Sequence, residues 1–300
     1  MTTASIPVDL FNAGQVFACL GLMEIAEVLF GQSQAAFDWS DPRQCRFLLG
    51  VEADADPIAA GLEFLAQAQV SAMAPPASEL DTEKWKVPCR AGPAAGPFPI
   101  PPPSTPATLP AVLSGPTCSI TISSWGEGRI PGALGSGRDN VKFWAGSGGY
   151  PGVALLRDAL DAIRSKIPEA TSDPFSVSAP QSSSFRLDWR RDYIPIDIGF
   201  SLNEHASIQP RGYPLVEALA VIGLCHARPR RIHKLKYQYA VVGRASAAAT
   251  HEPMFPASFV RAALGAARLP LATRTFTMHL NWPGQENQAR CITTVLEEAY

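Results

Sequence analysis

The sequence lacks most of the short motifs that announce an enzyme or a cofactor site. Its 300 residues contain no GxxxxGK[ST], GxSxG or HExxH motif, which argues against a P-loop, an α/β-hydrolase nucleophile and a zinc protease. The six cysteines are scattered and include no CxxC pair, so we expect free thiols and no zinc site. We therefore predict a protein that is not an enzyme and that holds neither a cofactor nor a metal.

Long apolar runs are also missing. No stretch of 18 consecutive apolar residues occurs, and the N-terminus MTTASIPVDLFNAG has no basic region ahead of an apolar segment. These absences predict that the chain has neither a membrane span nor a signal peptide. Together with the scattered cysteines, they indicate a cytoplasmic protein without a membrane partner.

Charged residues are scarce as well. Asp, Glu, Lys and Arg make up 17% of the chain, below the roughly 25% usual for globular proteins. The hydrophobic fraction of 46% excludes wholesale disorder, so the shortage of charge predicts that partners cover part of the surface. The net charge of −2 argues against a free-standing, strongly basic nucleic-acid binder.

The charge that is present lies unevenly along the chain. Residues 1–80 hold ten acids and two bases, a net charge of −8, so the remaining 220 residues carry +6. No acid lies between Glu217 and Glu252. This asymmetry predicts a polyanionic partner on one side of the molecule. The cations of the acid-free stretch are Arg228, Arg230, Arg231, Lys234, Lys236 and Arg244.

Hydrophobic periodicity predicts an α+β fold with mixed sheets, several amphipathic helices and a long Pro/Gly-rich loop region. Asn12 and Pro57 are the expected start signals of the first two helices. The expected helices are 14–31, 57–70, 152–166, 213–225 and 255–267. The expected strands are 35–39, 45–51, 117–125, 184–190, 193–200 and 232–242, with a terminal pair at 274–282 and 290–296.

Composition divides the chain into three parts. Residues 1–87 are predicted to form an acidic N-terminal α/β part, and residues 117–300 a β-rich α+β part with a basic face. Residues 88–116, which lie between them, contain ten prolines, and this density predicts a proline-rich loop or linker. A single integrated domain is the alternative.

The basic stretch is the strongest candidate site. On a continuous strand at 232–242, side chains alternate between the two faces, so Lys234 and Lys236 would share a face. Positive charge on one face binds phosphates without reading bases. A solvated basic face that binds nothing explains the same pattern equally well. The candidate contacts are Arg228, Arg230, Arg231, Lys234 and Lys236.

A glycine-rich segment at 126–149 is a second candidate. It precedes an expected helix and carries Arg129, Arg138 and Lys142, so we expect it to touch a polyanion. The lysine and the downstream carboxylate of nucleotide-cofactor motifs are missing, which disfavours a cofactor site. A plain mobile loop is the alternative.

Two stretches resemble a family encoded beside type I-G CRISPR systems, formerly called type I-U. The first is IPVDLFNAGQVFACLG at 6–21, and the second is FRLDWRRDYIP at 185–195. The similarity continues through Gly199-Phe200-Ser201, GYPLVE at 212–217 and WPGQ at 282–285. None of these strings implies a catalytic role.

The resemblance implies a non-enzymatic subunit of an RNA-guided, Cascade-like surveillance complex in antiviral defence, in the large-subunit position. Its partners would be the other effector subunits, guide RNA (crRNA) and target DNA, with a separate helicase–nuclease recruited transiently. Guide pairing would supply the sequence specificity. The alternatives are a protein-only scaffold subunit and a metal-independent endoribonuclease that processes guide precursors with His205 or His233 as the general base.

Overall fold

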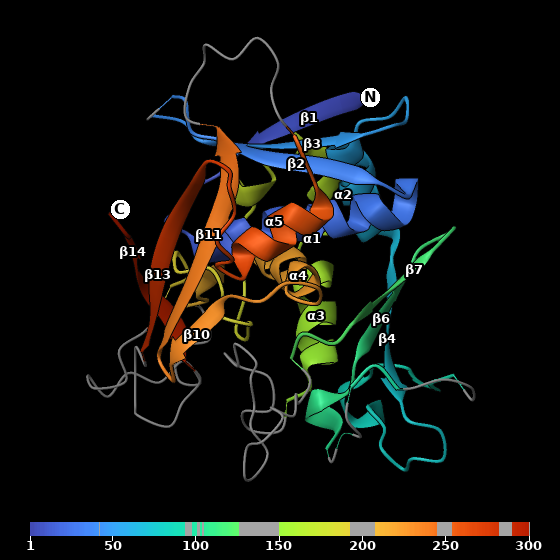
Figure 1. The fold of residues 1–300 in the computed structure, drawn as a ribbon. Coiled ribbons are helices and arrows are strands. Elements are labelled where there is room, and N and C mark those ends of the chain that lie inside the picture. Colours follow the sequence, from blue (N-terminus) through green and yellow to red (C-terminus); the bar gives the residue numbers. More distant parts are fainter. Residues whose placement is uncertain are drawn as a thin grey trace.

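The computed structural model describes residues 1–41, 43–93, 98–100, 103, 105–125, 150–192, 208–244, 254–281 and 290–299. Over these residues the chain forms five α-helices and several mixed sheets, which confirms the predicted α+β class. Helices α1, α4 and α5 lie in the middle of the molecule. The long strands β11, β13 and β14 stand on one side of them and β4, β6 and β7 on the other (Figure 1).

The largest sheet joins the two ends of the sequence. Its strands are β1 (Thr2–Pro7), β2 (Ser33–Asp38), β3 (Arg46–Val51), β10 (Arg230–His233), β11 (Lys236–Arg244), β12 (Phe255–Pro256), β13 (Thr273–Asn281) and β14 (Cys291–Glu297). They follow the order β1-β3-β2-β11-β13-β14, and β10 and β12 pair with β11 and β2. Strands β2 and β11 are parallel. The predicted terminal strand pair is confirmed as β13 and β14, which are antiparallel.

A second sheet has the order β5-β4-β6-β7. Its strands are β4 (Gln69–Ala74), β5 (Cys89–Ala91), β6 (Ala111–Ser114) and β7 (Ser119–Ile122), and a separate pair is formed by β8 (Ala179–Pro180) and β9 (Arg211–Gly212). The proline-rich segment therefore supplies β5 and β6 to this sheet. Pro110 directly precedes β6, and the strand itself contains no proline. All its backbone N–H groups can therefore donate, so it can pair on both sides.

The first two helices begin at the expected signals. They are α1 (Ala13–Phe30), α2 (Pro57–Gln67), α3 (Gly152–Asp161), α4 (Pro214–Gly223) and α5 (Ala257–Leu264). The Asn12 side chain accepts a hydrogen bond from the Gln15 backbone N–H, and the Asp56 carboxylate accepts two from the first turn of α2. Short 3₁₀ turns lie at Glu83–Trp85, Pro106–Thr108, Ile167–Glu169 and Pro174–Ser176.

Helix α1 is buried on all sides from Ala13 to Ala26, although the sequence predicts an amphipathic helix. Glu24, a charged residue that would lie on the solvent face of an amphipathic helix, is 4% exposed and accepts hydrogen bonds of 2.7 and 2.6 Å from the Arg261 guanidinium of α5. By length and mean hydropathy α1 could cross a membrane, but 78% of it is buried inside the protein. Its packing is that of the central helix of a globular core.

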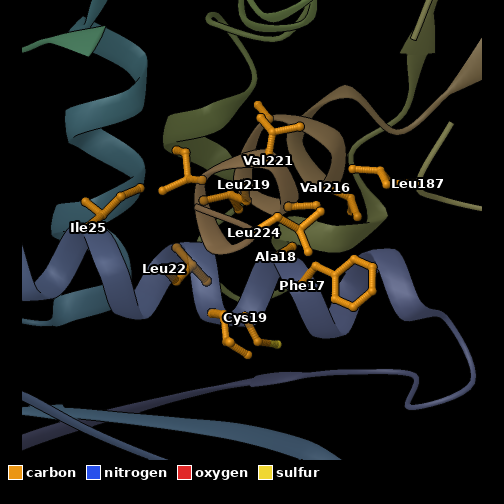
Figure 2. Packing of buried hydrophobic residues seen from close by; sticks show 14 of the residues in the cluster. Phe17, Ala18, Cys19, Leu22, Ile25, Leu187, Val216, Leu219, Val221 and Leu224 are labelled. Atoms are coloured by element: carbon orange, nitrogen blue, oxygen red, sulfur yellow. The ribbon is translucent and has the colours of Figure 1, made fainter. Parts of the chain in front are cut away.

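The core of the molecule is the contact between α1 and α4. Figure 2 shows Leu22 and Phe17 of α1 packed among Leu219, Val216 and their neighbours on α4. The two backbones approach closely because each helix places a glycine at the crossing. A Cβ atom on Gly21 would lie 2.0 Å from the Leu219 carbonyl oxygen, and one on Gly223 would lie 2.2 Å from that of Phe17. One hydrophobic cluster includes residues of both 1–87 and 117–300.

Two predicted strands are wrong. The segment 232–242 is not one strand, because the chain turns at Lys234 and Leu235 between β10 and β11. Residues 184–190 form an irregular loop in which Arg186 has φ of 61°. The backbone N–H groups of Arg186 and Leu187 donate to the Glu217 carboxylate of α4 instead of to a neighbouring strand. The strand expected at 193–200 lies outside the described residues.

Candidate nucleic-acid interface

The basic stretch forms a β-hairpin at one end of the large sheet. Strand β10 pairs antiparallel with the start of β11, with Arg230 opposite Gln238 and Arg231 opposite Tyr237. The register shifts before His233 meets Lys236, and a two-residue turn closes the hairpin. The preceding helix α4 is wholly apolar apart from Glu217, so the change to a run of cations marks where the chain leaves the core.

The hairpin projects its cations into solvent. Arg230, Arg231, His233 and Lys234 are exposed, and Lys236 is half-buried. Within the described part of the chain, Arg231 and Lys234 have no ion pair or hydrogen bond through their side chains. Ile232, between them in sequence, is 49% exposed. The hairpin tip is therefore a cationic surface that acidic groups of the described residues do not neutralise.

Arg230 is held in place by a polar network that the sequence did not reveal. Its guanidinium donates to the Gln238 side chain, whose amide donates at 2.6 Å to the Glu298 carboxylate. The Thr277 hydroxyl donates to the same carboxylate. The hydrogen bond from Thr277 is the largest cause that lowers the pKa of Glu298, and the cations Lys236 and Arg230 act in the same direction. This carboxylate therefore stays ionised and orients one edge of the hairpin.

The sheet separates this polar face from the core. Lys236 and Gln238 share a face of β11. The prediction that Lys234 shares a face with Lys236 is wrong, because Lys234 lies in the turn. Tyr239 points to the opposite face, where its hydroxyl donates at 2.7 Å to the Leu10 carbonyl oxygen. Its ring stacks on Phe276 with centroids 5.3 Å apart. The aromatic residues of β11 thus hold the hairpin on the core and make no surface for bases.

The remaining predicted contacts fall in two groups. Arg228 is described and half-buried, whereas Arg129, Arg138 and Lys142 lie outside the described residues. His205, one of the two general bases of the endoribonuclease alternative, also lies outside them. His233 is exposed beside the cations, and the Leu235 backbone N–H donates to its Nδ1 at 3.5 Å. The described part of the chain contains no cluster of three His, Cys, Asp or Glu residues that could hold a metal ion.

The two long strings that carry the resemblance meet in a buried network. Asn12 from the first string donates through Nδ2 to the Asp188 carboxylate at 2.9 Å, and both residues are fully buried. Glu217 accepts hydrogen bonds of 2.9 Å from the backbone N–H groups of Arg186 and Leu187. Arg190 is bonded to Asp188 and lies over the Tyr213 ring at 3.6 Å. The network fixes the loops on either side of the helix pair.

Glu217 gives the fold a specific pH dependence. Burial raises the pKa of Glu217 from its ordinary 4.5 to about 7, although the Arg191 cation and the backbone N–H groups oppose the rise. The folded protein then keeps this proton up to about pH 7, whereas the unfolded chain loses it near pH 4.5. The free energy of unfolding therefore has its full contribution from this proton below about pH 4.5. It falls by about 3 kcal/mol as the pH rises from about 4.5 to about 7.

Urea unfolding at pH 5 and pH 8 measures this fall. Glu217→Gln cannot ionise, so its free energy of unfolding should change less between the two pH values than that of the wild type. Equal changes in the two proteins would exclude Glu217 as the source.

The hairpin, with its ordered edge and free tip, is chemically suited to sequence-independent phosphate contacts. The charge and exposure of these residues are what indicate a binding surface. Comparisons with protein families, with curated proteins and with solved structures gave no match.

Proposed function

We propose that this protein is a non-enzymatic, cytoplasmic subunit of a type I-G CRISPR surveillance complex and contacts guide RNA or target DNA. The observation that carries the proposal is the exposed hairpin tip, where Arg231 and Lys234 lack acidic partners among the described residues. Unneutralised cations on a fixed strand pair suit a phosphate backbone. The resemblance of the two strings supplies the biological setting.

The division of charge fits a subunit that is covered on its other sides. Residues 1–80, with their net charge of −8, would face neighbouring effector subunits or solvent, and the hairpin would face nucleic acid. Guide pairing would read the sequence. The subunit would hold the backbone and present the target to the helicase–nuclease. A charged fraction of 17% is in keeping with a surface buried in an assembly.

Filter binding to single-stranded RNA and duplex DNA at two salt concentrations tests the hairpin. Arg231→Ala/Lys234→Ala should weaken binding at low salt. It should also make the slope of log affinity against log salt shallower by about 1.5, because each lost phosphate contact removes about 0.7 to 0.9. Lys84→Ala/Arg90→Ala removes the same charge from exposed sites on 3₁₀ turn 83–85 and strand β5 and should leave the slope unchanged. Equal slopes for the hairpin variant and the wild type would overturn the proposal.

The endoribonuclease alternative has one supporting observation, the exposed His233 beside Arg231 and Lys234. It requires that the protein cleave repeat-containing RNA in the presence of a metal chelator and that His233→Ala abolish the cleavage. The binding role predicts intact RNA with both proteins.

A further inference from the structure

A second surface feature lies away from the hairpin, where β1 leads into α1. It is an open cavity of about 460 Å³. The loop 8–12 forms one wall, and the opposite walls come from the segment before β3, from the 3₁₀ turn Pro174–Ser176 and from β13. The volume falls within the range of small-ligand sites.

Three arginines line the cavity, and each has hydrogen-bond donors to spare. Arg190 is bound through Nε and Nη2 to Asp188, and Arg274 is bound through the same atoms to Glu297 at 2.6 Å. In the described part of the chain, the Nη1 groups of both have no partner. Arg43 is exposed, and its guanidinium makes no ion pair with a described residue. Guanidinium donors therefore meet at the cavity from three separate segments.

Acceptors and an aromatic surface line the same cavity. Two acidic residues, Asp9 and Asp173, are among the residues that line it. Phe11 also lines it, 43% exposed, with its ring edge-on to the buried Phe276 at a centroid distance of 5.3 Å. A simple anion is disfavoured, because Asp9, Asp173, Asp188 and Glu297 together outnumber the three arginines. Mixed donors and acceptors beside an exposed ring suit a planar heteroaromatic group.

The wall that carries Phe11 is rigidly built. The Asp9 backbone N–H donates to the Gln15 side chain at 2.8 Å, and the Asp9 carboxylate accepts from the Phe11 N–H at 2.9 Å. Asn12, next in the loop, is fixed to Asp188 inside the protein. A surface loop anchored by buried polar groups holds its exposed ring in one place, which lowers the entropy cost of stacking a ligand.

We propose that this cavity binds one unpaired nucleotide. The base stacks on Phe11 with its polar edge toward Asp9, Asp173 and the arginines, and Arg43 at the rim meets the phosphate. The nucleotide is either free or part of a single strand. Binding of a nucleotide within a single strand rests on the function proposed above. Binding of a free nucleotide does not, because the chemistry of the cavity does not depend on the hairpin.

Calorimetric titration with the four nucleoside monophosphates, and with a short single-stranded RNA, tests the proposal. At least one probe should bind, and Phe11→Ala should weaken its affinity by about five- to 150-fold, the usual range for loss of one stacked base. Phe259→Ala removes a ring that is 41% exposed on α5 and should change nothing. Arg43→Ala should weaken a monophosphate more than its nucleoside.

The source of the nucleotide follows from the hairpin variant. Arg231→Ala/Lys234→Ala should bind monophosphates with wild-type affinity even if it loses the strand, so failure of the hairpin proposal leaves the cavity proposal intact. No saturable binding of any monophosphate or of the strand would overturn the cavity proposal, and so would equal affinities of Phe11→Ala and the wild type.

Discussion

Gly21→Ala should destabilise the fold by about 3 kcal/mol or more, although alanine is the better helix former by about 1 kcal/mol. The new methyl group would lie 2.0 Å from the Leu219 carbonyl oxygen. That oxygen belongs to the backbone of α4, so neither helix can accommodate the methyl group without moving. Overpacking of a core costs about 1 to 3 kcal/mol when side chains can adjust, and more is expected when two backbones must separate.

Gly61→Ala is the matched control. Gly61 lies inside α2, and its added Cβ would meet the side chains of Ile25 and Leu22 at 3.6 Å, an ordinary contact distance. This variant should be unchanged or more stable by up to about 1 kcal/mol. Urea unfolding of both variants measures the difference. Equal stabilities would mean that α1 and α4 do not cross as closely as described.

Asp188→Ala should cost about 3 to 5 kcal/mol, the usual loss when one partner of a buried ion pair is removed. The carboxylate is fully buried and accepts from Asn12 and Arg190. The substitution leaves a buried amide and a guanidinium without their acceptor. It also loosens the loop that holds Phe11, so nucleotide binding in the cavity should weaken with it.

Asp161→Ala on α3 is the control for this variant. Asp161 also pairs with an arginine, Arg164 at 3.1 Å, but its side chain is 53% exposed. Exposed pairs contribute about 0 to 1 kcal/mol. A loss for Asp188→Ala as small as that for Asp161→Ala would show that the buried network does not hold the two strings together.

Local signals made part of the fold predictable. The first helix starts at the cap Asn12, and α2 and α4 start at Pro57 and Pro214, because cap geometry depends on a few neighbouring residues. The terminal strand pair was predictable from alternation. The burial of α1 on all sides from Ala13 to Ala26 was not predictable. Glu24 has the charge of a surface residue, and its partner Arg261 lies more than 200 positions away in the sequence.

The hairpin was not predictable from the sequence pattern. Residues 232–242 alternate like one strand, and the turn at Lys234 and Leu235 contains none of the glycine or asparagine residues that usually mark such a turn. The loop 184–190 failed for another reason. The Leu187 backbone N–H donates to the carboxylate of Glu217, 30 positions away in the sequence. No local sequence pattern predicts such a partner.

The sequence predicted which cations belong to the candidate site, but it did not predict how the fold arranges and pairs them. The absence of acids after Glu217 identified the residues, whereas the network that positions Arg230 joins β11, β13 and the C-terminal Glu298. Which cations are neutralised depends on such tertiary pairing. The fold, and not the composition, leaves Arg231 and Lys234 exposed and without acidic partners among the described residues.

The function that we propose requires that this chain belong to an RNA-guided complex. The most direct measurement is purification of the tagged full-length chain from cells that also express the other effector proteins of a type I-G CRISPR system and a guide array, followed by sequencing of the bound RNA. We predict that the chain co-purifies with other effector subunits and with RNA of guide and repeat sequence. Recovery of the chain alone, or of a protein complex without guide RNA, would contradict the claim.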